Sequence, residues 1–180
     1  MIWIDLARIL IPGLLFGIIL GKFLLKRPKY IELMNFSTWK RKAKKFNREK
    51  WIRIITLSII FGITSFFVVM ATYRLMEEIW TVPMSKGNIF TMIPLPILIV
   101  SISVIPIVEE WIFRGVILEE ISKISKSKIA GLIASSLLFA LFHLSNPGTN
   151  LSAVPPYLVA GMIIGSSYIV GGLAVATLSH

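Results

Sequence analysis

The stretch VIPIVEEWIFRGV, residues 104–116, places two carboxylates and one guanidinium inside an otherwise apolar part of the chain. The 22 residues 87–108 contain no charged side chain, and the 52 residues 129–180 contain no Asp, Glu, Lys or Arg. About 18 such residues already predict a transmembrane helix. The charges therefore fall within a predicted membrane span, where ionisable residues are unfavourable and indicate a functional site.

The composition supports a membrane protein made of helices. Hydrophobic residues make up 56% of the 180 residues and the mean hydropathy is +0.81, whereas soluble domains contain roughly 45–50% apolar residues. We predict an all-α, polytopic transmembrane helical bundle with about five complete spans and a partial sixth. The predicted spans are residues 3–25, 51–73, 98–121, 129–144 and 155–170, followed by a last helix that begins near Gly172. The sequence has no Cys, which excludes disulfides and thiol catalysis.

Basic residues concentrate in one predicted loop. Residues 26–50 contain ten Lys and Arg against Glu32 and Glu49, a net charge of +8. Cytoplasmic loops carry such an excess, so we place loop 26–50 in the cytoplasm and the N-terminus outside, in a multi-pass protein of the cell membrane. By alternation the later turn SKISKSK, with its three lysines, also falls inside. We expect the lipid bilayer as a partner and no nucleic acid, because the loop has no nucleic-acid-binding motif.

Helix geometry separates the two glutamates. Residues four apart share a helix face, so Glu110 and Arg114 are placed to form an ion pair. Adjacent residues point about 100° apart, which leaves Glu109 without a local partner and available as a general base. Pro106, three residues before Glu109, removes a backbone hydrogen bond and predicts a kink.

The two histidines of the chain, His143 and His180, both lie in apolar segments. Glu109 is 12 residues before Ile121, the predicted end of its helix, or about 18 Å along the axis. His143 is 15 residues after Lys128, or about 22 Å along the next helix. In an antiparallel hairpin, Glu109 and His143 therefore reach a similar depth, where both can act on one water molecule.

Hydrolysis is the chemistry that this combination favours. A carboxylate and a histidine can deprotonate water and later protonate a leaving amine, while a second histidine can stabilise the developing oxyanion. One carboxylate and two histidines can also bind zinc and leave a position for water, although the sequence has no H-E-x-x-H motif. The residues alone do not decide between hydrolysis by these side chains and hydrolysis at a zinc site.

Three short motifs resemble those of a known family. The sequence supplies EEWIFR with Glu109, Glu110 and Arg114, FALFH with Phe139 and His143, and GGLAVATLSH ending at His180. In this order they are similar to the motifs E-E-x-x-x-R, F-x-x-x-H and H-x-x-x-N/D of the CPBP family (CAAX proteases and bacteriocin-processing enzymes, also called Abi). The resemblance covers about residues 95–180, so we expect an N-terminal membrane region, 1–90, and a CPBP-like catalytic domain, 91–180.

The resemblance implies an intramembrane glutamic endopeptidase that acts on a membrane-associated protein or peptide. Relatives process the C-termini of prenylated CAAX proteins, or act in peptide processing and bacteriocin self-immunity. By analogy, Glu109 and His143 would activate water and His180 would help to form the oxyanion site. The supporting residues would be Glu110, Arg114 and Phe139. The resemblance predicts no obligatory metal, and zinc at Glu109, His143 and His180 is the lesser alternative.

The third motif continues in the family to an Asn or Asp four positions after its histidine, and His180 is the last residue here. We therefore expect a chain truncated at its C-terminus, in which the loss of one oxyanion donor lowers the rate by about 10²–10³. The alternatives are a catalytically impaired or non-enzymatic membrane immunity or scaffold protein of the same fold, and a proton or ion pathway.

Overall fold

The structure is a computed structural model that describes residues 2–80, 95–146 and 149–180. Every regular element within these ranges is a helix, which agrees with the all-α prediction. The main helices are α1 (Ile2–Leu25), α2 (Pro28–Glu32), α3 (Phe36–Ala43), α4 (Arg48–Trp80), α6 (Leu95–Ser103), α7 (Ile105–Glu110), the π-helix η1 (Trp111–Leu118), α8 (Glu119–Ser125), α9 (Lys128–Phe142) and α10 (Val154–Ser179). Short 3₁₀ turns, His143–Ser145 and Leu151–Ala153, extend α9 and precede α10.

Three of the described helical segments are long and apolar enough to cross a membrane: Arg48–Trp80, Lys128–Ser145 and Leu151–Ser179. Five complete spans are therefore not confirmed. The described apolar part of α1, Leu10–Leu25, is shorter, and the segment that contains the glutamates is divided into α6, α7, η1 and α8. The predicted domain boundary at residue 90 lies outside the described residues.

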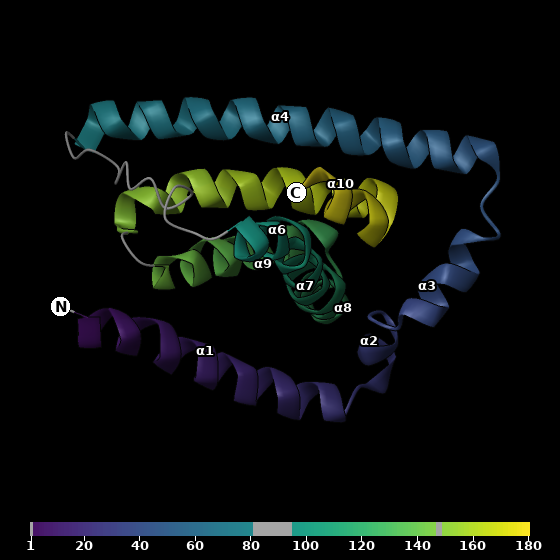
Figure 1. Cartoon of the computed structure of the whole chain (residues 1–180), viewed down its shortest axis with the longest axis horizontal. Coiled ribbons are helices and arrows are strands. Elements are labelled where there is room, and N and C mark those ends of the chain that lie inside the picture. Colours follow the sequence, from purple (N-terminus) through teal and green to yellow (C-terminus); the bar gives the residue numbers. More distant parts are fainter. Residues whose placement is uncertain (1, 81–94, 147–148) are drawn as a thin grey trace.

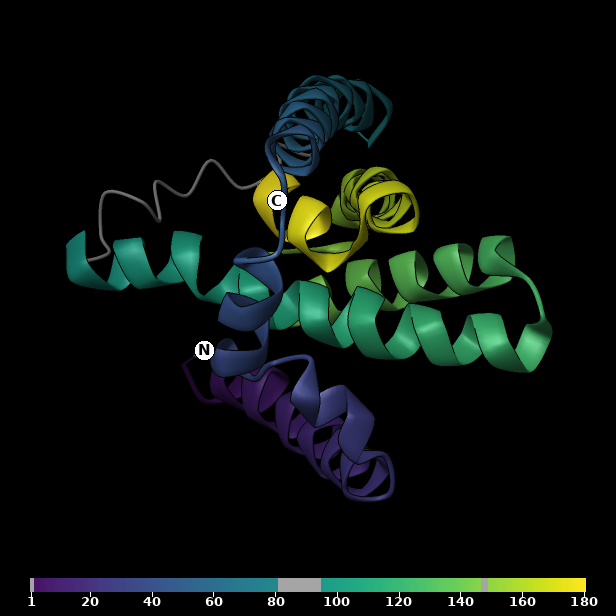
Figure 2. The same cartoon turned by 90° about the vertical axis from the view of Figure 1, so that its right-hand side faces the viewer.

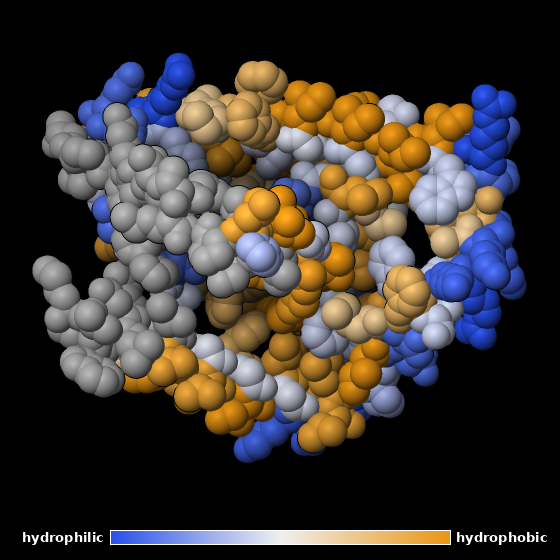
Figure 3. All heavy atoms as spheres, viewed as in Figure 1, coloured by the Kyte–Doolittle hydropathy of each residue, from blue (hydrophilic) through white to orange (hydrophobic). Residues whose placement is uncertain are grey.

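The helices are arranged in four layers (Figures 1 and 2). Helix α4 is followed by α10, then by the run from α6 to α9, then by α1. Helices α4 and α10 pack against each other in opposite directions, whereas α6 to α8 cross them steeply and appear end-on in Figure 1. Hydrophobic residues follow the length of α4 (Figure 3), and large side chains such as Phe67, 65% exposed, point outward from it. Such an extensive exposed apolar face suits contact with lipid.

Close helix packing at glycines brings the central layers together. A Cβ atom on Gly161 of α10 would lie 3.0 Å from the backbone Cα of Ser136 on α9. A Cβ atom on Gly62 of α4 would lie 3.2 Å from the carbonyl oxygen of Ser179. The small residues therefore allow α10 to lie close to both α9 and α4.

Two backbone irregularities shape the part of the fold that carries Glu109, Glu110, Arg114 and His180. The helix predicted over 98–121 is interrupted at Val104, next to Pro106 in the first turn of α7, where a kink was expected, and it widens into η1 after Glu110. Proline lacks the N–H that a continuous helix would need. Gly172 has φ 77° and ψ −174°, a region that is essentially restricted to glycine. The chain turns there, as predicted, and its last turns fold back toward α7 (Figure 1).

The N-terminal half differs from prediction in its helix lengths. Helix α4 continues to Trp80 rather than ending at residue 73, because the polar residues after Tyr73 prolong the helix. The basic loop 26–50 contains α2 and α3, and α3 begins at a side-chain cap in which the Asn35 oxygen accepts hydrogen bonds from the Ser37 and Thr38 N–H groups.

Candidate active site

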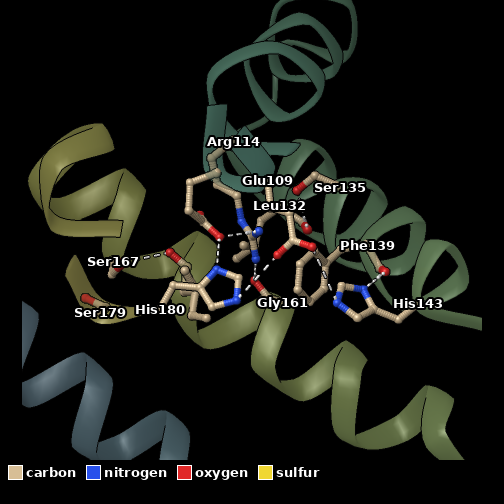
Figure 4. A network of polar contacts seen from close by, with 12 residues as sticks. Glu109, Arg114, Leu132, Ser135, Phe139, His143, Gly161, Ser167, Ser179 and His180 are labelled. Atoms are coloured by element: carbon tan, nitrogen blue, oxygen red, sulfur yellow. Dashed lines mark hydrogen bonds and ion pairs between the residues drawn. The ribbon is translucent and has the colours of Figure 1, made fainter. Parts of the chain in front are cut away.

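The six residues selected from the sequence come together at the meeting point of four helices (Figure 4). They come from the end of α7, from η1, from the last turn of α9 and the residue after it, and from the end of the chain after α10: Glu109, Glu110, Arg114, Phe139, His143 and His180. The cluster therefore depends on the fold-back at Gly172, since only that turn brings His180 to α7.

The cluster contains a fully buried ion pair. Arg114 Nη1 lies 2.8 Å from Glu110 Oε1, and both side chains are 0% exposed. The other guanidinium arm donates to the Gly161 carbonyl oxygen at 3.1 Å, and the Arg114 guanidinium lies 4.6 Å from the Phe139 ring centroid. The i,i+4 pair expected from the sequence is thus present, and it also joins η1 to α9 and α10.

Glu110 has a second partner, which the sequence analysis missed. His180 Nδ1 lies 2.9 Å from Glu110 Oε1, the same oxygen that Arg114 contacts. A carboxylate paired with a guanidinium can only accept hydrogen bonds, so the His180 ring donates from Nδ1. Its other nitrogen, Nε2, lies 3.6 Å from Glu109 Oε2. His180 therefore lies between the two adjacent glutamates.

His143 has a similar arrangement on the opposite side of Glu109. His143 Nδ1 lies 2.9 Å from the Phe139 carbonyl oxygen, which can only accept, so the ring again donates from Nδ1. His143 Nε2 lies 3.8 Å from Glu109 Oε1. The Glu109 carboxylate, 17% exposed, is thus flanked by the Nε2 atoms of two histidines (Figure 4).

Aromatic rings fix the position of the His143 imidazole. Its ring centroid lies 4.3 Å from that of Phe139 and 4.4 Å from that of Tyr157 in the first turns of α10. Phe139 also lies 5.9 Å from the His180 ring, so it contacts both histidines. Tyr157 was not selected from the sequence. Its spacing of four residues from Gly161, which lies against α9, was the available signal that it faces the same layer.

The geometry of the possible ligands bears on the metal alternative. Across residues 2–80, 95–146 and 149–180, no group of three or more His, Cys, Asp or Glu side chains has an arrangement that could hold a metal ion. The donor types around Glu109 are nonetheless ones that zinc uses. That no metal is obligatory therefore stays a prediction, which chelation tests.

Comparison with known proteins identifies the second half of the chain. A family model described as "Rce1-like: Type II CAAX prenyl endopeptidase Rce1-like" matches residues 91–180, a segment that includes all six residues of the cluster. Neither the curated proteins nor the solved structures give a match.

Proposed function

Because the chain belongs to the Rce1-like type II CAAX prenyl endopeptidase family, we propose that it is an intramembrane glutamic endopeptidase with its catalytic centre at Glu109. The observation that supports this most directly is the position of the Glu109 carboxylate between two imidazoles. Each imidazole has its Nδ1 held by another protein group and its Nε2 directed at Glu109. Such an arrangement fixes the orientation of each ring, as catalytic histidines require.

The surroundings of the two histidines suit different roles. His143 donates from Nδ1 to a neutral carbonyl group, so its uncharged ring presents the Nε2 lone pair and can accept a hydrogen bond from water. His180 donates from Nδ1 to the Glu110 carboxylate, which fixes the orientation of its ring. Only the charged form of His180 can also donate from Nε2, as an oxyanion site requires.

The proposed reaction begins with a water molecule held by Glu109 and His143. Glu109 takes a proton from this water, and the resulting hydroxide attacks the carbonyl carbon of the scissile peptide bond. His180 stabilises the oxyanion of the tetrahedral intermediate through Nε2–H. The C–N bond then breaks while the proton on Glu109 passes to the leaving amine. Glu110 and Arg114 position His180, and Phe139 packs against both imidazole rings.

The substrate would be a membrane-associated protein or peptide. The family name supports C-terminal processing of CAAX proteins, and processing of bacteriocin-like peptides with self-immunity is the related possibility within this class of enzyme. In the proposed topology, loop 26–50 is cytoplasmic and the N-terminus is outside. Residues 91–180 form the catalytic domain and residues 1–90 an N-terminal membrane region.

Cleavage of a membrane-anchored peptide by the chain in proteoliposomes tests this proposal. We expect Glu109→Gln and His143→Ala each to abolish cleavage, because each removes a group that activates water. Glu32→Gln, an exposed carboxylate in the basic loop, is the matched control and should cleave like the wild type. A chelator should leave the rate unchanged, and loss of activity that zinc restores would support the metal alternative.

Two results would contradict the proposal. Wild-type rates in either active-site variant would remove Glu109 or His143 from the mechanism. A folded wild-type chain that cleaves neither CAAX-type nor bacteriocin-type peptides would instead favour a non-enzymatic immunity or scaffold protein with the same fold.

A further inference from the structure

A second cavity, separate from the catalytic cluster, lies where the start of α4 meets the break in α10. It has a volume of about 450 Å³. Its polar side is formed by Asn47, Glu49, Lys50 and Arg53. Gly171, which directly precedes the backbone turn at Gly172, lines it. The turn that brings His180 to the active site thus leaves a hollow beside the first turns of α4.

The cavity lies at the depth of lipid headgroups. Residues 54–73 of α4 are 20 consecutive uncharged residues, which span about 30 Å and match the thickness of the hydrocarbon core. Lys50 and Arg53 precede this stretch directly. Figure 3 shows hydrophilic residues gathered at this end of the molecule, and hydrophobic residues along α4 beyond it. The polar side of the cavity therefore faces the interfacial layer on the side of the basic loop.

The two cations of the cavity have no protein counter-ion among the described residues, where no carboxylate lies within ion-pair distance of Lys50 or Arg53. The Lys50 ammonium lies 3.9 Å from the Phe46 ring centroid, which favours a defined position for it. Glu49 lines the same cavity, so the charged lining still carries a net positive charge of two cations against one carboxylate. This balance favours an anionic ligand.

The opposite wall is apolar. It is formed by side chains of α4 and α10: Ile54, Leu57, Val170 and Val175. Ile54 and Val175 are already buried in the fold. An anion without a hydrocarbon part would leave the accessible surface of Leu57 and Val170 uncovered, whereas an amphiphile covers both sides of the cavity. We propose that the cavity binds an anionic phospholipid of the leaflet that faces the basic loop, with its phosphodiester at Lys50 and Arg53 and the first part of its acyl chain against the apolar wall. The proposal does not depend on the proposed peptidase function.

Lipid binding to the purified full-length chain in detergent tests this site. Native mass spectrometry with phosphatidylglycerol or phosphatidylcholine measures the two affinities directly. We expect the wild type to prefer phosphatidylglycerol. The double variant Lys50→Gln/Arg53→Gln should bind it about 30-fold more weakly, because each basic residue near an anionic surface contributes about fivefold. Glycerophosphoglycerol, which has the headgroup without the chains, should compete poorly.

Two matched variants distinguish binding in the cavity from nonspecific electrostatic attraction between basic residues and an anionic lipid. Lys40→Gln/Lys44→Gln removes the same charge from the neighbouring basic segment, outside the cavity lining, and should bind phosphatidylglycerol nearly like the wild type. Val170→Trp changes no charge but fills the cavity, and should weaken binding as much as the loss of both cations. Unfolding temperatures without added lipid check that each variant is folded.

Any of three results would overturn the proposal. These are equal loss of binding in the two charge variants, wild-type binding by folded Val170→Trp, and equal affinity for phosphatidylcholine. Full competition by glycerophosphoglycerol would show that the cavity takes a soluble anion instead of a lipid.

Discussion

Replacing Arg114 by Met should destabilise the fold strongly, because it leaves the Glu110 carboxylate buried without the guanidinium and with only His180 Nδ1 as a hydrogen-bond donor. Both side chains are 0% exposed and the charged atoms lie 2.8 Å apart, so water does not solvate the remaining charge. Removing one partner of such a buried pair costs about 3–5 kcal/mol. Met keeps much of the side-chain volume, which makes charge rather than a cavity the main change. Unfolding free energies in mixed detergent micelles measure the effect.

The double variant Glu110→Gln/Arg114→Met tests whether the unpaired charge is the cause. It removes both charges, and the Gln amide oxygen can still accept the hydrogen bond of His180 Nδ1. We expect it to be more stable than either single variant by about 2 kcal/mol or more, since replacing a buried pair by neutral groups is often nearly neutral. If the double variant is as unstable as Arg114→Met, packing around the side chain, and not the buried carboxylate, determines the stability of this region.

Two further predictions concern the position of the histidines. Tyr157→Ala should lower the cleavage rate about 2- to 10-fold, because the ring that packs 4.4 Å from His143 contributes about 0.5–1.5 kcal/mol. Tyr157→Phe keeps the ring and should cleave like the wild type; equal loss in both would assign the effect to the hydroxyl. Gly172→Ala should lower the free energy of unfolding by about 1–3 kcal/mol, because the backbone φ of residue 172 is 77°. An unchanged free energy of unfolding would contradict this prediction.

The parts of the structure that follow from local geometry were predictable from the sequence. Helix α9 and its 3₁₀ extension run over Lys128–Ser145, close to the predicted 129–144, since an uninterrupted apolar run defines its own length. The contact between Glu110 and Arg114 was predictable because residues four apart share one face of a helix. The turn at Gly172 also carried a local signal, two adjacent glycines.

Features that depend on tertiary contacts were not predictable in the same way. The hydrogen bond between Glu110 and His180 joins residues 70 positions apart, and nothing in either segment indicates it. The prediction that Glu109 and Glu110 face different surroundings assumed an ideal helix and one partner for Glu110. The widening of η1 after Glu110 and the fold-back of the last turns bring His180 within 3.6 Å of Glu109 as well. The predicted number of spans is not confirmed, because apolar length alone does not show where a helix breaks.

The contacts of the two adjacent glutamates explain why they would not be interchangeable in catalysis. Glu110 Oε1 already accepts from Arg114 and His180, and the Glu110 side chain is fully buried, so it is poorly placed to take a proton from water. Glu109 faces the Nε2 atoms of both histidines, at distances longer than a direct hydrogen bond. Its carboxylate can therefore still accept hydrogen bonds from a water molecule or a substrate group. We infer that Glu110 controls the orientation of His180, and that Glu109 acts on the substrate. The chain turns at Gly172, and His180 at its end contacts both Glu109 and Glu110. Two consecutive residues of α7 can therefore have different roles.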